Sequence, residues 1–147
     1  MKFRLIIDKN VDEEIVATVH ARSSLIRQIE DLVNSYTGSD FIMGYRDGET
    51  RRLSYTDIEC ITVLDRKVYA IDTEGRHYRL QGRLRDMEEI LPSYFIRINK
   101  STLANEHRIL RFDAAFSGSV DTVFRCGYRD YVSRRCFREI KRRYEGI

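Results

Sequence analysis

The sequence predicts a mainly β protein with flanking helices, an α+β fold whose sheets are built from short antiparallel strands. From residue 40 onward, short strand-like runs alternate with turn signals such as Asp47-Gly48 and Glu74-Gly75. Apolar residues at helical spacing recur in only three stretches, 23–36, 82–92 and 134–147. This pattern is typical of antiparallel sheets with helices at their margins.

The N-terminal region 1–37 is predicted to form a separate β-β-α extension. Lys2–Asp8 is expected to be a strand with alternate apolar side chains on one face. Residues 13–21 are rich in β-branched side chains and predict a second strand after a turn at 9–12. A helix is expected over 23–36, capped by one of the two serines at its start.

Residues 38–147 are predicted to form the main domain. Its expected strands are 41–45, 52–55, 58–64, 68–72, 77–80, 95–98, 109–116, 120–125 and 131–133. The short helix at 82–92 ends at Pro92, which cannot continue it. The tail 134–147 is predicted to be a basic helix.

Composition limits the functional classes. The apolar runs are too short to span a bilayer, and Asp8 interrupts the first of them, so neither a membrane span nor a signal peptide is expected. The three cysteines lack metal-site spacing, which favours reduced thiols and a cytoplasmic location. Nucleotide-loop, zinc-protease and hydrolase motifs are absent from the sequence. We therefore expect no enzyme activity, cofactor, metal or small-molecule substrate. Cys136, beside Arg134 and Arg135, fits either a reactive thiol or a small apolar helix residue.

Basic charge is concentrated in the last third of the chain. Residues 97–147 contain 12 Lys and Arg against 6 Asp and Glu, whereas residues 1–96 contain 14 against 17. This asymmetry fits a polyanionic partner, and it equally fits a solvated basic face.

The predicted junction between the last strand and the last helix contains Ser133, Arg134 and Arg135. Helix N-terminal N–H groups can bind phosphate, and an arginine fork matches the guanine edge in the major groove. Pairing with Asp130 or Glu139 is the alternative. It cannot account for all the basic residues of this region, which are Arg129, Arg134, Arg135, Arg138, Lys141, Arg142 and Arg143.

The segment FIRINKSTLAN, followed by an isoleucine, a Ser-Gly pair and YVSR, resembles the signature of the LytTR DNA-binding domain family. The residues that match in order are Phe95, Arg97, Lys100, Ser101, Ala104, Asn105, Ile109, Gly118, Val132, Ser133 and Arg134. The resemblance covers roughly residues 40–147 and leaves out the first 36.

The resemblance implies an elongated domain that contacts DNA through loops rather than through a recognition helix. The DNA-binding residues carried over are Arg66, Lys67, Asn99, Lys100, Ser101, Ser133, Arg134, Arg135 and Arg138. Arg135, with Arg66 or Lys67, would enter the major groove, and Lys100 would contact the backbone. Asn105 is expected to hold a turn by bonding the main chain.

The chain departs from the family pattern at three points. Cys126 stands where a polar turn residue is usual, and Cys136 stands where an aromatic is frequent. No phosphate-accepting receiver domain is expected before residue 40, so control by aspartyl phosphorylation within this chain is not expected. The resemblance implies instead a membrane-protein regulator as a candidate partner.

The function expected from the sequence is sequence-specific binding of double-stranded DNA and regulation of transcription in a bacterium. Two copies are expected on a direct repeat, with at most a weak dimer before DNA binds, and the N-terminal hairpin is the expected surface for one. The alternative is an interaction module whose basic C-terminal helix binds an acidic protein or an anionic membrane surface.

Overall fold

The structure is a computed structural model that describes residues 1–12, 14–37 and 40–145. Seven strands form a large sheet: β1 (Phe41–Arg46), β2 (Glu49–Ser54), β3 (Ile58–Leu64), β4 (Lys67–Asp72), β5 (His77–Arg79), β6 (Phe95–Asn99) and β7 (Thr102–Asn105). Three form a small sheet: β8 (Ile109–Ala114), β9 (Val120–Phe124) and β10 (Arg129–Val132). The helices are α1 (Ser24–Thr37), α2 (Leu84–Ile90) and α3 (Arg134–Glu145), with short 3-10 turns at Tyr55–Asp57 and Glu106–Arg108.

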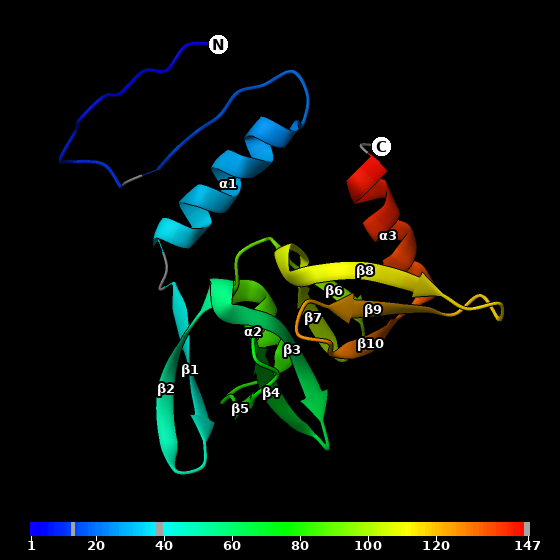
Figure 1. Cartoon of the computed structure of the whole chain (residues 1–147). Coiled ribbons are helices and arrows are strands. Elements are labelled where there is room, and N and C mark those ends of the chain that lie inside the picture. The colour runs from blue at the N-terminus through cyan, green and yellow to red at the C-terminus, as the bar shows by residue number, and fades with distance from the viewer. Residues whose placement is uncertain (13, 38–39, 146–147) are drawn as a thin grey trace.

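The strand order is β2-β1-β5-β4-β3-β7-β6 in the large sheet and β10-β9-β8 in the small one, and every paired strand is antiparallel (Figure 1). The predicted class, antiparallel sheets with helices at the margins, is confirmed. None of the described helices is long and apolar enough to cross a bilayer.

One strand of the large sheet was not predicted from the sequence. β7 lies between β3 and β6, and all four of its residues are buried. Only Leu103 and Ala104 of this strand are apolar. Thr102 and Asn105 are polar residues whose side chains are hydrogen-bonded inside the protein, so hydrophobic alternation did not reveal the strand. The polar cluster in FIRINKSTLAN is therefore the turn of a β6–β7 hairpin.

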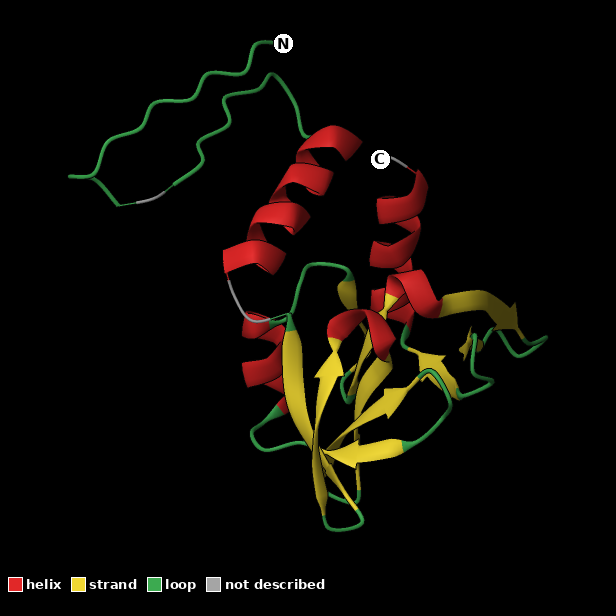
Figure 2. Cartoon of the chain, turned by 60° about the vertical axis from the view of Figure 1, so that its left-hand side comes forward, coloured by secondary structure: helices red, strands yellow, loops and turns green. Residues whose placement is uncertain are grey.

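The prediction of paired N-terminal strands is wrong. Residues 1–12 and 14–23 contain no strand, although the chain runs out and back on itself beyond α1 (Figures 1 and 2). The expected turn is present, and the Asn10 N–H donates to the Asp8 carboxylate at 2.9 Å. A two-stranded hairpin with nothing packed on it is marginal in water, which explains the missing ladder. The predicted helix is confirmed as α1, with the Ser23 hydroxyl accepting the Ile26 N–H at 3.4 Å.

Two hydrophobic cores cover opposite faces of the large sheet. Alternation along β3 sends Ile61 to the core beneath α2 and Cys60 to the core shared with the small sheet and α3. The second core also contains Cys136, 4% exposed, and Ile140. Of the two interpretations of Cys136, a reactive thiol or a small apolar helix residue, the structure supports the second.

A buried carboxylate ties the two sheets together. Glu59 is fully buried, accepts the Arg108 Nε–H at 2.6 Å and accepts the Cys126 N–H at 2.7 Å. The three cysteines are free thiols, and burial raises the pKa of Cys60 well above its usual value. The packing of both sheets and α3 on one another positions the basic turns described next.

Candidate nucleic-acid interface

The β3–β4 turn and the β6–β7 turn lie side by side at one end of the large sheet. Thr62 is the register partner of Thr102, and their hydroxyls are 2.7 Å apart. One residue further, the Val63 N–H donates to the Ser101 carbonyl at 2.9 Å. Antiparallel pairing of β3 with β7 therefore brings Arg66 and Lys100 to the same end of the molecule.

The β6–β7 turn is also joined to the start of α3. The Asn99 amide donates to the Tyr131 carbonyl at 2.8 Å, and the Ser133 N–H donates to the Ile98 carbonyl at 2.9 Å. The Thr102 hydroxyl donates to the Asp130 carboxylate at 2.5 Å. The three segments that the sequence predicted to contact DNA are thus brought together by hydrogen bonds within the protein.

The β3–β4 turn presents two basic side chains. Asp65 and Arg66 have φ of 50° and 63°, the left-handed pair that a tight hairpin turn requires. Neither is a glycine, so each residue costs about 1 kcal/mol or more to hold in this conformation. Arg66 and Lys67 are exposed beside a hollow of about 450 Å³ that Arg79 also lines.

The β6–β7 turn separates a bracing arginine from a free lysine. The Arg97 guanidinium donates to the Lys100 carbonyl at 2.9 Å and lies 2.5 Å from the Glu88 carboxylate. Lys100 itself is exposed and forms no ion pair with any described residue. Ser101 is half-buried, and its N–H donates to Asn99 Oδ1 at 2.8 Å.

Two asparagines of this hairpin act inside the protein. Asn99 was expected to contact DNA, but its side chain is fully buried, and both its amide nitrogen and its oxygen are already bonded. The structure therefore gives Asn99 the role of joining two loops. Asn105 holds a turn as expected, donating to the Ile58 carbonyl at 2.9 Å and accepting the His107 N–H at 3.0 Å.

The start of α3 exposes three arginines around a capping serine. The Ser133 hydroxyl accepts the Cys136 N–H at 3.2 Å, which caps the helix. Arg134, Arg135 and Arg138 are exposed and form no ion pair within the described chain. The exposed cations at this end therefore keep their charge available to a partner.

Neither Asp130 nor Glu139 forms an ion pair with these arginines in the described chain. The Asp130 carboxylate, one of their expected alternatives, accepts the Thr102 hydroxyl and the Tyr131 N–H. By contrast, Arg129 is bonded to Asp113 and Asp121, and Arg143 to Glu106. The basic tail thus contains arginines that are paired within the protein and exposed arginines without an ion pair in the described chain, among them the three at the helix start.

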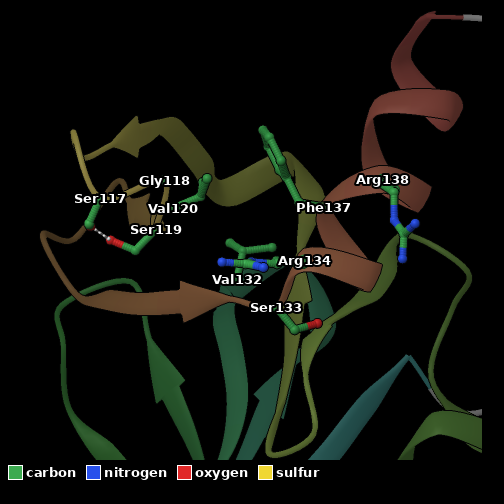
Figure 3. A pocket seen from close by; sticks show the side chains of 9 residues that line it. All are labelled: Ser117, Gly118, Ser119, Val120, Val132, Ser133, Arg134, Phe137 and Arg138. Atoms are coloured by element: carbon green, nitrogen blue, oxygen red, sulfur yellow. Dashed lines mark hydrogen bonds between the residues drawn. The ribbon is translucent and has the colours of Figure 1, made fainter.

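A hollow of about 970 Å³ adjoins this helix start and has a wall that the sequence did not indicate (Figure 3). Ser117, Gly118 and Ser119 of the β8–β9 loop line one side, opposite Arg134. The neighbouring Phe116 is fully exposed. Only the Ser-Gly turn signal could have drawn attention to this loop, because neighbouring loops cannot be identified from sequence spacing.

Tyr128 is half-buried in the polar layer beneath the turns, near Cys60 and Asp130. Burial raises the pKa of Tyr128 to about 12, with nearby Cys60 and Asp130 acting in the same direction. The phenol is therefore neutral at physiological pH. Among the described residues, no group of three His, Cys, Asp or Glu side chains has a metal-binding arrangement.

Comparisons with known proteins identify the fold and the family of this chain. The chain is 31% identical to an HTH-type transcriptional regulator of Staphylococcus aureus strain NCTC 8325, and 31% identical to one of the bovine strain RF122, each over 97% of both chains. A solved LytTr DNA-binding domain from Bacillus cereus has the same fold, with a TM-score of 0.66 and 19% identity over 75% of this chain and all of that one. The family model of the LytTr DNA-binding domain matches residues 48–145. This chain belongs to the LytTR DNA-binding domain family.

Proposed function

We propose that this protein is a transcription regulator that binds double-stranded DNA through the end of the molecule where the three basic segments meet. The observation that carries the proposal is the hydrogen-bonded convergence of the β3–β4 turn, the β6–β7 turn and the start of α3. Each segment contributes at least one exposed cation that has no carboxylate partner in the described chain. These cations are Arg66, Lys67, Lys100, Arg134, Arg135 and Arg138. Such cations replace condensed counterions on DNA.

The segments divide between reading bases and holding the backbone. Arg135, on the first turn of α3, and Arg66, at the tip of a tight turn, are proposed to contact base edges in the major groove. Lys100 lies between them and is proposed to contact phosphates. Ser101 and Ser133 support these contacts through main-chain bonds. Two copies bind neighbouring half-sites that form a direct repeat, as the family resemblance implies.

The alternative of a membrane or acidic-protein module receives no support from α3. Its apolar residues Cys136 and Ile140 are buried in the core, and Phe137 is half-buried. A peripheral membrane helix needs a free apolar face. Its exposed residues are instead almost all charged.

The experiment is selection of the purified chain on a randomised duplex library, followed by salt titration on the enriched sequence. Log affinity should fall against log salt with a slope of about −0.9 for each phosphate contacted. Heparin and vesicles of anionic lipid serve as polyanion controls. A slope near zero, no enriched sequence, or equal affinity for vesicles and duplex would overturn the proposal.

A further inference from the structure

The N-terminal arm, residues 1–12 and 14–23, exposes more large apolar side chains than any other described segment of the chain. Every described residue of the arm is exposed. Phe3 is 91% exposed, Leu5 71% and Ile7 83%. The other large apolar side chains exposed there are Met1, Ile6, Val11, Ile15, Val16 and Val19. A monomer rarely keeps such a continuous apolar surface in water, so the arm has the properties of an interaction site.

The backbone of the arm also lacks partners. Within residues 1–12 and 14–22, the described hydrogen bonds of the main chain are limited to that between Asn10 and Asp8. The composition is that of a strand, with alternating apolar side chains in Lys2–Asp8. Two strands alone are marginal, whereas three or more with an apolar face are stable. A second arm would supply the missing strands.

We propose that the arm pairs with the arm of a second copy of this chain across a two-fold axis, with Lys2–Asp8 antiparallel to its own copy. In a pairing centred on Leu5, the two Leu5 residues face each other and Phe3 faces Ile7. Lys2 of each copy then faces Asp8 of the other. The segment is thus complementary to itself in both charge and apolar pattern, which a two-fold interface requires.

The length of the arm allows an interface larger than the paired segment itself. The arm has 22 described residues, and a standard interface takes roughly 20–30 residues from each partner. The proposed pairing of Lys2–Asp8 uses seven of them, and other exposed apolar side chains of the arm, such as Ile15 and Val16, are available to extend it.

A lipid surface is a weaker candidate for the same arm. Residues 1–23 contain four basic and four acidic side chains, so the arm has no net charge to attract anionic lipid. Three of the four acidic residues are consecutive in the sequence, Asp12, Glu13 and Glu14, and would be repelled by such a surface. The pattern favours a partner that offers both signs of charge, as a second arm does.

The arm lies away from the proposed DNA interface. Arg143, near the end of α3, lies close to Asp31 of α1. Burial raises the pKa of Asp31, and the charge of Arg143 opposes this rise. The α3 helix starts at the DNA-binding end and rises about 14 Å from Arg134 to Arg143, at 1.5 Å per residue. Arm pairing therefore leaves the basic segments of each copy exposed. A two-fold pair presents its two DNA-binding ends in opposite orientations, whereas copies on a direct repeat share one orientation. The copies paired through their arms are thus not the two copies that occupy one direct repeat.

The first test is sedimentation of the full chain without DNA over a range of concentrations. We expect a monomer–dimer equilibrium in the wild type. Leu5→Asp places two carboxylates opposite each other at the axis and should weaken the dimer at least about a hundredfold. The matched control Ile90→Asp replaces a residue on α2 that is 60% exposed and should leave the dimer unchanged. A wild type that stays monomeric, or equal effects of both variants, would overturn the proposal.

The second test separates pairing between copies from folding of the arm on itself. Lys2→Glu and Asp8→Lys should each weaken the dimer about tenfold or more, because like charges then face each other. Mixing the two variants restores both charge pairs, but only between different copies. We expect the mixture to regain the wild-type dimer, whereas failure to recover would rule out the Leu5-centred pairing. Binding of a single half-site duplex should be unaffected in all variants, so its loss would count against the proposed function and not against the arm.

Discussion

The Asn99 side-chain amide donates a hydrogen bond of 2.8 Å to the Tyr131 carbonyl, 32 residues further along the chain. This bond joins the β6–β7 turn to the strand that leads into α3. The oxygen of the same amide accepts the Ser101 N–H, so one buried side chain fixes both the turn and its distance from the helix. The spacing between Lys100 and Arg135 therefore depends on a side chain buried inside the protein.

We predict that Asn99→Ala destabilises the protein. The Tyr131 carbonyl and the Ser101 N–H would lose their partner, and a buried polar group left unbonded costs about 1–3 kcal/mol. Urea unfolding, followed by circular dichroism, measures the change. DNA affinity should fall while the preferred base sequence stays the same.

The matched comparison for that variant is Lys100→Ala, the neighbouring exposed residue. Its unfolding free energy should change by no more than about 0.5 kcal/mol. If Asn99→Ala kept full stability and altered base preference, Asn99 would be a reading residue after all, as the sequence had suggested.

Arg135→Ala should relax base discrimination at one position of the site. Loss of a bidentate contact to a base costs roughly 1–3 kcal/mol on the preferred sequence. The measurement is binding to a panel of duplexes with single-base changes. Arg129→Ala is the control, because Arg129 is bonded to Asp113 and Asp121 and should read no base. Uniform loss of affinity with base preferences intact would assign Arg135 to the backbone.

Lys100→Ala should weaken binding to all sequences alike. Removal of one phosphate contact lowers the steepness of the salt dependence by about one unit of slope. Affinity at several salt concentrations, on preferred and scrambled duplexes, measures this effect. Arg51→Ala, at an ion pair with Glu49 on β2, should leave the slope unchanged. A sequence-dependent loss would show that Lys100 reads bases.

Two half-sites should be bound with the highest affinity when they form a direct repeat. Duplexes with the enriched half-site repeated in direct or inverted orientation, at spacings varied in single base pairs, test the arrangement. Cooperative binding should peak at spacings that differ by one helical turn, about 10–10.5 base pairs. Preference for an inverted repeat would contradict the expectation taken from the family resemblance.

Local sequence patterns identified most of the fold because the body of this domain is built from hairpins. Asp47-Gly48 and Glu74-Gly75 mark turns by their chemistry, and apolar alternation marks the strands between them. The pattern failed at β7, because two of its four buried residues, Thr102 and Asn105, are polar. Their side chains are hydrogen-bonded inside the protein instead of making apolar contacts. It also failed in the N-terminal arm, because strand propensity without a covering surface does not produce a paired strand.

The sequence by itself determined which residues are basic, which lie in turns and which family signature they form. Only the tertiary structure decided which of those cations are free. Arg134 and Arg135 form no ion pair within the described chain, and Asp130 is bonded instead to Thr102, 28 positions earlier in the chain and in the other sheet. Asn99 is also polar, but its side chain is buried because the segment that leads into α3 packs over it. Both outcomes depend on contacts between segments distant in the chain, and such contacts form only when the two sheets pack together.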